Sequence, residues 1–299
     1  MKSRLNGGVD PHYQSRETHI ETPRRSAQVV SKPLLNLRRE SEFEGLSDLI
    51  HSFSNNKTLL YVPNQGNWGD ALIHKGTLQF LDYFGFDYKV ATRAEVIEFA
   101  NQSRRFGLVA SDVVLASGGG GSWRNANSAN YRFFQSAIGA FEKGMVFPHT
   151  YEYTEVSESN SEILYVSRDT SLSKKSIPQS STCHDMAFFL QLPSLIRTDD
   201  SGLSGYFMRA DPERHPQARS IGTGFDLSSM GNHLSQVTPF FQIIQQFSEI
   251  STDRMHVAIA GAMLGASVKL YPGNYGKAIS VYRHSLLRNY PNVQIREWS

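Results

Sequence analysis

Cysteine is nearly absent from this sequence of 299 residues, which contains a single one, Cys183. One thiol excludes an intrachain disulfide framework and a cysteine-rich zinc or iron–sulfur site. No apolar run reaches the roughly 18 residues that a membrane span needs, and residues 1–8 lack the apolar segment of a secretory signal. These absences favour a soluble protein of the reducing cytoplasm, without a transmembrane segment.

A surplus of charge of either sign is also missing. Lys and Arg together number 30 and Asp and Glu number 28, so the formal net charge is only +2. A chain this close to neutral lacks the electrostatic footprint of a nucleic-acid-binding protein. We therefore expect no nucleic-acid partner.

Apolar residues are plentiful enough for a folded core. Hydrophobic residues make up 39% and charged residues 19% of the chain, which argues against disorder throughout. At ~150 residues per domain, the length predicts about two domains. The polar residues 1–45 predict an N-terminal arm, and the polar stretch 151–161 predicts a linker between domains at 46–155 and 156–299. The final helix of the second domain can pack back on the first.

Short apolar runs alternate with amphipathic segments in both predicted domains. The expected strands are 58–63, 88–91, 113–117, 145–148, 163–167, 185–190, 206–209, 250–252 and 268–271. The expected helices are a segment that Asp70 caps and the ranges 95–101, 131–143, 239–247, 255–264 and 277–287. This alternation is typical of two parallel-sheet α/β domains.

Parallel sheets bind ligands on the loops beyond the carboxyl ends of their strands. Four such loops are expected here, at 66–70, 118–124, 167–171 and 251–256. Each predicted domain supplies two of them. The predicted site is therefore a cleft between the domains.

Sequence motifs for common cofactors are missing. Residues 118–121 are all glycine and follow a strand, but the G-x-G-x-x-G dinucleotide fingerprint would need glycine in place of Trp123 or Arg124. The glycine run is then either a flexible turn that permits close packing or a loop that faces a ligand. Walker A, H-E-x-x-H, D-x-D and G-x-S-x-G patterns do not occur. We therefore expect neither a cofactor nor a metal ion.

The most informative stretch is 251–256. A strand is expected to end at Thr252, Asp253 to cap a helix, and Arg254 and His256 to occupy its first turn. A helix start has free N–H groups and a partial positive charge, so it favours an anion. Arg254 then either pairs with a carboxylate or meets an anionic ligand. His256 is either packed in the helix or, beside a bound phosphate, holds a proton and acts as an acid.

Two further loop residues have both a structural and a functional interpretation. Arg168, at the carboxyl end of a strand, is either a surface arginine or projects into the cleft, where its planar fork suits a carboxylate or phosphate. Asp70 is a helix cap, a cleft carboxylate near Asn67, or both. Histidines without metal-ligand spacing, expected in the core or on the surface, are His74, His149 and His184.

Taken in order along the chain, these stretches resemble the polysaccharide pyruvyl transferase family. Each match is weak alone, but the ordered set over about residues 58–285 is specific. Family members usually have leucine, glycine and glutamine at the positions of Met255, Val257 and His149. The matching residues are Gly66-Asn67-Trp68-Gly69-Asp70-Ala71-Leu72-Ile73, the glycine run at 118–121, Pro148-His149-Thr150, Ser167-Arg168-Asp169, Asp185-Met186-Ala187-Phe188, Thr252-Asp253-Arg254-Met255-His256 and Asn274-Tyr275-Gly276-Lys277.

The resemblance implies a fold of two Rossmann-like parallel-sheet domains that face a central cleft, similar to GT-B enzymes and bacterial sialyltransferases. It implies transfer of pyruvate from phosphoenolpyruvate to a sugar of an exopolysaccharide or cell-wall glycan, usually as a ketal. The acceptor would be a glycan or a lipid-linked oligosaccharide, which leaves room for peripheral membrane contact.

The resemblance also assigns roles to individual residues. Arg168 would bind the anionic groups of the donor, His256 would contact the donor and act as acid or base, and Asp70 would be a cleft carboxylate important for activity. The full set of implied donor-binding residues is Asn67, Gly119, Gly120, Arg168, Arg254, Met255, His256 and Lys277.

Two other functions fit the same residues. One is a two-domain GT-B-like glycosyltransferase that uses a nucleotide sugar, and the other is a non-catalytic protein that binds an anion or a glycan. For the pyruvyl transferase we expect phosphate release from phosphoenolpyruvate only when a glycan acceptor is present. We also expect His256→Ala and Arg168→Ala to lose turnover while the fold remains.

Overall fold

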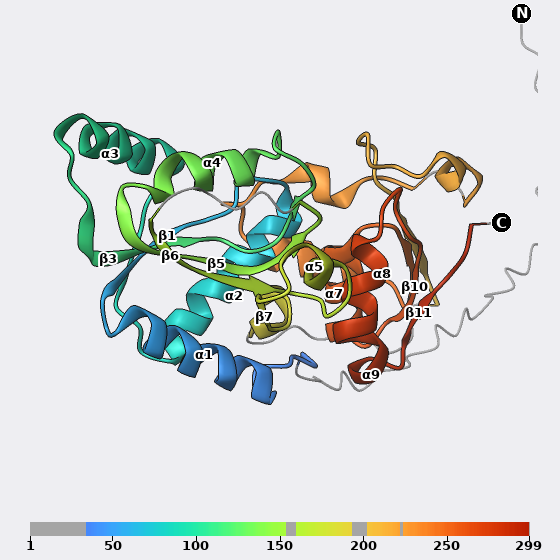
Figure 1. Ribbon diagram of the computed structural model, residues 1–299. Coiled ribbons are helices and arrows are strands. Elements are labelled where there is room, and N and C mark those ends of the chain that lie inside the picture. The colour runs from blue at the N-terminus through green and yellow to red at the C-terminus, as the bar shows by residue number, and fades with distance from the viewer. Residues whose placement is uncertain (1–33, 154–159, 193–201, 222–223, 299) are drawn as a thin grey trace, which may run out of the picture.

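The computed structural model describes residues 34–153, 160–192, 202–221 and 224–298. The chain forms two β-sheets whose strand pairs are all parallel, with helices packed against them (Figure 1). The predicted α/β class with parallel sheets is confirmed. Residues 1–33 of the predicted arm and 154–159 of the predicted linker lie outside the described residues.

The first sheet has the strand order β2-β1-β3-β5-β6-β7, and the short β4 pairs with β5 outside this order. Strand β1 lies inside the sheet between β2 and β3, and its Leu59, Tyr61 and Val62 are almost completely buried. The strands are β1 (Thr58–Val62), β2 (Tyr88–Val90), β3 (Ala110–Ser117), β4 (Ser122–Trp123), β5 (Phe141–Tyr151), β6 (Glu162–Ser167) and β7 (Ser181–Thr182). The helices of this half are α1 (Ser41–Ser54), α2 (Trp68–Tyr83), α3 (Arg93–Phe106), α4 (Ala129–Ile138), α5 (Leu172–Ser176) and the 3-10 helix η1 (Met186–Phe189).

The second sheet has the strand order β11-β10-β9-β8. Its strands are β8 (Ser204–Phe207), β9 (Glu249–Thr252), β10 (Ser267–Leu270) and β11 (Val293–Ile295). The helices of this half are the 3-10 helices η2 (Pro216–Ile221) and η3 (Leu227–Met230), then α6 (Thr238–Ile244), α7 (Met255–Met263), α8 (Lys277–Val281), the π-helical turn η4 (Tyr282–Leu286) and α9 (Leu287–Asn289). Among the helices described, none has both the length and the apolar character needed to cross a bilayer.

Helices cover both faces of the first sheet, with α3 and α4 above it and α1 below it in Figure 1. The upper face buries one apolar cluster, which includes Val96 and Phe134. The cluster on the lower face includes Phe43 of α1 and Phe188 of η1, and it continues into the second sheet as far as Val268. One core therefore joins the two halves and fixes the loops of one sheet relative to those of the other.

The first sheet extends further along the chain than the sequence analysis predicted. Strands β6 and β7 fall within the predicted second domain, 156–299, but both pair in the first sheet. The polar stretch interpreted as a domain linker thus connects two neighbouring strands of one sheet. Strand connections and domain linkers are both polar, so composition does not separate them.

Several predicted elements differ from the structure in type or length, and two of these differences are the clearest. The run at 185–190 is not a strand but the helix η1, which Asp185 caps by accepting a hydrogen bond from the Ala187 N–H. The helix predicted at 131–143 ends at Ile138, and β5 already begins at Phe141. Short apolar runs do not distinguish a strand from a buried helical turn.

Candidate functional site

A cavity of about 550 Å³ lies between the carboxyl ends of the two sheets. Its lining comes from loops that follow strands of both halves: Asn64 after β1, Gly121 after β3, Arg168 after β6, Arg209 after β8 and Asp253 after β9. Parallel α/β sheets bind ligands at this edge, because helix starts and loop side chains converge there. The cavity therefore occupies the position expected of a binding site.

Most residues that the sequence analysis singled out line this cavity. Asp70 and Arg168 reach it from the first half, and His256 reaches it from the second. The other implied donor-binding residues that line it are Asn67, Arg254, Met255 and Lys277.

Gly119 and Gly120 do not line the cavity, although the resemblance implied a donor-binding role for both. A Cβ atom at Gly119 would lie 2.5 Å from the Pro148 carbonyl oxygen. Gly120 has a φ of +81°, and a Cβ atom there would lie 2.1 Å from Ile73. These glycines are needed for close packing of the loop, so the packing interpretation of the glycine run holds for them. Gly121 is the member of the run that lines the cavity.

Helix α2 begins at the cavity with both of its first-turn caps in place. The Asn67 side chain accepts a hydrogen bond from the Gly69 N–H at 2.8 Å, and the Asp70 carboxylate accepts one from the Asn67 N–H at 2.9 Å. This reciprocal arrangement is a capping box. Asp70 is thus the third helical residue rather than the N-cap that the sequence analysis predicted. Its other oxygen accepts a hydrogen bond from the Asn64 side chain at 3.0 Å.

Helix α7 begins at the opposite wall without a side-chain cap. Its N-cap is Arg254, whose cationic side chain cannot accept hydrogen bonds from the first-turn N–H groups. The first helical residues, Met255 and His256, line the cavity. An uncapped helix start has free donors and a partial positive charge, so the arrangement suits an anion.

Asp253 does not cap α7, contrary to the sequence analysis. One of its oxygens accepts a hydrogen bond from the Arg209 N–H at 2.7 Å, and the other is buried without a hydrogen-bond partner. Burial raises the pKa of Asp253, and the neighbouring Arg209 and Arg254 offset only part of that rise. A buried carboxylate in a cavity wall with a free oxygen is a candidate proton donor or acceptor, a role the sequence analysis did not predict.

Arg168 lines the cavity but is 1% exposed, and its guanidinium is held by neighbours. It donates to the Asp185 carboxylate at 2.6 Å, to the Thr150 hydroxyl at 2.9 Å and to the Gly121 carbonyl at 2.6 Å. The surface-arginine interpretation is therefore wrong. Arg168 positions the Gly121 loop and Asp185 beneath the cavity, and its positive charge contributes to the cavity wall.

His256 lies beside the same buried carboxylate. Its Nε2 is 3.6 Å from an Asp185 oxygen and has no hydrogen-bond partner. Burial alone would raise the pKa of Asp185, but His256 and Arg168 together hold it well below its usual range. A carboxylate beside an imidazole is a common arrangement at catalytic sites. The imidazole fits there because a Cβ atom at Gly69 would lie 2.3 Å from its Nδ1.

Arg254 pairs with carboxylates, which is one of the two alternatives that the sequence left open. Its Nε donates to Asp226 at 2.9 Å, and its Nη2 contacts both Asp226 and an Asp211 oxygen, the latter at 2.7 Å. Asp226 is 7% exposed. The pairing fixes the guanidinium at the start of α7, so Arg254 lies at the cavity in a single orientation.

A second charged group lies around Glu213, which the sequence analysis did not single out. The Arg209 guanidinium is 2.6 Å from Glu213, and the Tyr275 hydroxyl donates to Glu213 at 2.8 Å. The Lys277 ammonium is more loosely held, at 3.8 Å from the same carboxylate. Burial lowers the pKa of Lys277 to about 8; Glu213 opposes this shift, and the nearby Arg168 and Arg209 add to it.

A signal for these missed residues was present in the sequence. Arg209, Asp211 and Glu213 follow β8 directly, as Asp253 follows β9. The rule that ligands bind beyond the carboxyl ends of parallel strands applies to β8 as well. The loop after β8 lacks the glycine and capping signals that mark the four predicted loops.

Comparison with known protein families gives no match for the chain, and no curated protein matches it. Among solved structures, the fold is similar to that of a functionally uncharacterised protein from Klebsiella pneumoniae, with a TM-score of 0.63 and 21% sequence identity. The similarity covers 85% of this chain and 98% of that protein. At this identity the likeness shows a shared fold over most of both chains.

Proposed function

We propose that this protein transfers the pyruvyl group of phosphoenolpyruvate to a sugar, with ketal formation across two hydroxyls. The observation that carries the proposal is the uncapped start of α7, where His256 lies beside Arg254 in a cleft shared by both halves. The two parallel sheets around that cleft are consistent with a pair of Rossmann-like domains in a GT-B-like arrangement. The residue pattern that resembles pyruvyl transferases supplies fewer than half of the residues that line the cavity, but these include Asp70, Arg168 and His256.

The donor in this proposal has a carboxylate and a phosphate, so its site needs several positive groups. The cavity lining contains Arg124, Arg168, Arg209, Arg254 and Lys277. Arg168 and Arg254 have short ion pairs with buried carboxylates, and Lys277 has only a distant one. We therefore assign direct contact with the donor to Lys277 and to the N–H groups of α7. The paired arginines fix the walls and add positive charge.

The reaction needs an acid to start it. A proton added to C3 of phosphoenolpyruvate makes C2 electrophilic, and a sugar hydroxyl attacks C2. We assign this proton to His256, because its imidazole lines the cavity and its Nε2 lies 3.6 Å from the Asp185 carboxylate. The bond between C2 and the phosphate oxygen then breaks, and a second hydroxyl attacks C2 to close the ketal. The two hydroxyls release two protons, of which one balances the proton added to C3 and one leaves on inorganic phosphate.

The acceptor in this proposal lies against the first half. Asn64, Asn67 and Asn130 line that side of the cavity, and amide side chains both donate and accept hydrogen bonds, as sugar hydroxyls require. Asp70 lies among them and acts as the base for the attacking hydroxyl. Each of its oxygens accepts one hydrogen bond in the structure, and a carboxylate oxygen can accept a second.

Two measurements on the full-length protein test this function. Thermal unfolding with phosphoenolpyruvate and with a panel of nucleotide sugars identifies the donor, since a ligand that binds the folded state raises the Tm. Phosphate release from phosphoenolpyruvate with and without glycan acceptors then tests turnover. We expect a Tm rise with phosphoenolpyruvate and acceptor-dependent phosphate release. A Tm rise with a nucleotide sugar alone would indicate a glycosyltransferase, and donor binding without turnover on any acceptor would indicate a binding protein.

A further inference from the structure

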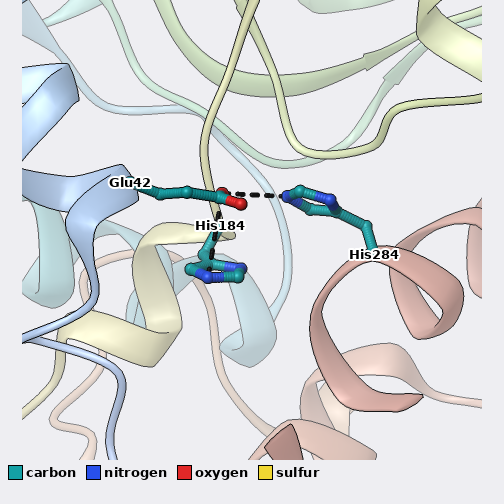
Figure 2. A group of neighbouring side chains, drawn as sticks. All are labelled: Glu42, His184 and His284. Atoms are coloured by element: carbon teal, nitrogen blue, oxygen red, sulfur yellow. Dashed lines mark hydrogen bonds and ion pairs between the residues drawn. The ribbon is translucent and has the colours of Figure 1, made fainter. Parts of the chain in front are cut away.

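Two histidines and a glutamate from distant parts of the chain meet outside the cavity. Glu42 lies in the first turn of α1, His184 precedes η1, and His284 lies in the π-helical turn η4. Figure 2 shows the Glu42 carboxylate between the two imidazoles. One Glu42 oxygen is 3.0 Å from His284 Nε2 and 3.7 Å from His184 Nε2. The three atoms all lie within 4.8 Å of one another.

These separations match those between the ligands of a small divalent metal ion. Zinc bonds to imidazole nitrogen and carboxylate oxygen are about 2.0–2.2 Å long, so two ligands of a tetrahedral site lie roughly 3.4 Å apart. The measured 3.0 and 3.7 Å fall on either side of that value. The group therefore needs only small side-chain movements to surround an ion.

The two histidines are buried, and at least one is held in a fixed orientation, as expected of metal ligands. The side chains of His184 and His284 are 5% and 7% exposed. His184 Nδ1 lies 2.9 Å from the Ser285 hydroxyl, an interaction that orients the ring with Nε2 toward Glu42. Metal-bound histidines are oriented in this way by a partner on the second ring nitrogen. The aromatic rings of Phe43 and Phe188 pack around His184 and limit water access.

The local backbone at His284 points the same way. His284 lies in a π-helical turn, an irregularity that is frequent at functional sites. The turn widens the helix where His284 reaches toward Glu42.

We propose that Glu42, His184 and His284 bind one divalent transition-metal ion, with zinc as the ion that this ligand set favours. Two imidazoles and one carboxylate are typical zinc ligands, and they leave the fourth position for water. The ion would join α1 to the C-terminal helical segment, since Glu42 and His284 are 242 residues apart in sequence. Such a link stabilises the folded chain, because the unfolded chain does not hold the three ligands together.

The test uses the full-length protein after treatment with a chelator. Calorimetric titration with Zn²⁺ should show one tightly bound ion per chain, and titration with Co²⁺ should give the visible absorption of a four- or five-coordinate ion. We expect Glu42→Gln and His284→Gln each to weaken Zn²⁺ binding by at least about 100-fold. Zn²⁺ should raise the Tm of the wild-type protein and not the Tm of these variants.

The matched control is His51→Gln, which removes a histidine from the same helix α1 at a site where the ring stacks on Phe86. It should bind Zn²⁺ as tightly as the wild type. Glu42 is 35% exposed, so Glu42→Gln is expected to fold even if a histidine variant does not, and circular dichroism verifies this. Wild-type binding no tighter than that of Glu42→Gln would overturn the proposal. None of these readouts uses phosphoenolpyruvate, so they do not depend on the proposed function.

Discussion

Two helices begin at the cavity, one from each half, and they differ in how their first turns are capped. The start of α2 is closed, because Asn67 and Asp70 satisfy its N–H groups and place a carboxylate beside them. The start of α7 has no side-chain cap and follows two strand-end residues, Asp253 and Arg254, that pair with neighbours instead. Topologically equivalent positions therefore differ in what they offer a ligand. The start of α2 provides a carboxylate and amides. The start of α7 provides free N–H donors and a guanidinium, with the Asp253 carboxylate behind them.

This difference assigns the two substrates of the proposed reaction to two sides of the cavity, which we call the α2 wall, around Asn67 and Asp70, and the α7 wall, around Arg254, His256 and Lys277. A negatively charged donor is repelled by Asp70 and attracted by the start of α7. A sugar is neutral, and it benefits from the amides and the carboxylate near α2.

The ion pair between Arg168 and Asp185 lies behind the start of α7, where Asp185 is 3.6 Å from His256. Arg168→Ala leaves Asp185 without its main partner at 0% exposure, and the loss of one member of a buried pair costs about 3–5 kcal/mol of unfolding free energy. Because both side chains of the pair are buried, we now expect Arg168→Ala to destabilise the fold, whereas the sequence alone predicted that the fold would remain. Urea denaturation measures the loss. The control Arg124→Ala removes an arginine that is 40% exposed, and we expect a loss of at most about 1 kcal/mol.

His256 tests whether the chemistry belongs to the α7 wall. His256→Gln keeps a polar side chain but cannot carry the proton, so phosphate release should fall by about 100-fold or more while phosphoenolpyruvate still raises the Tm. The side chain is 14% exposed and its Nε2 makes no hydrogen bond, so little stability should be lost. The matched histidine variant is His51→Gln on α1, which should release phosphate at the wild-type rate. Equal rates in the two variants would remove His256 from the mechanism.

Asn67 tests whether the start of α2 is structural. Asn67→Ala removes a side-chain cap and should cost about 1 kcal/mol of unfolding free energy. On our account the affinity for phosphoenolpyruvate stays the same, because the donor lies at α7. Calorimetric titration and urea denaturation of the same preparation measure both quantities. A large loss of donor affinity would return Asn67 to the donor-binding set that the family resemblance implied.

The pH dependence of phosphoenolpyruvate affinity tests whether the positive charge of Lys277 binds the donor. Its folded-state pKa of about 8 is below its ordinary value, so the ammonium loses its proton as pH rises through that range. The affinity for phosphoenolpyruvate should then fall above about pH 8 and be retained below it. Lys277→Arg should move this decline to higher pH, since arginine stays protonated. A pH profile that is the same for both proteins would show that Lys277 does not contact the donor.

The sequence predicted which loop residues meet at the cavity better than it predicted the sheets around them. Asp70, Arg168 and His256 were expected in one cleft because each follows a strand in an α/β pattern, and the structure places all three at one cavity. The assignment of β6 and β7 to a sheet could not be predicted, because pairing between strands is a long-range property that local composition does not encode.

The interaction partners of individual side chains could not be predicted from the sequence either. Asp70 and Asn67 are both good capping residues, and only the backbone geometry decides that Asn67 is the N-cap and Asp70 the third helical residue. The ion pairs of Arg254 with Asp226 and Asp211 join separate loops. His184 showed no metal-ligand spacing along the chain, because its partners, Glu42 and His284, come from distant elements.

A structure of the protein with phosphoenolpyruvate bound would show where the donor lies. We predict that a phosphate or carboxylate group of the donor lies within hydrogen-bond distance, about 2.7–3.2 Å, of backbone nitrogens in the first turn of α7. We also predict that Lys277 contacts the donor and that the asparagine side chains near α2 stay free to bind a sugar. A donor seated against the start of α2, or outside the cavity, would contradict these predictions.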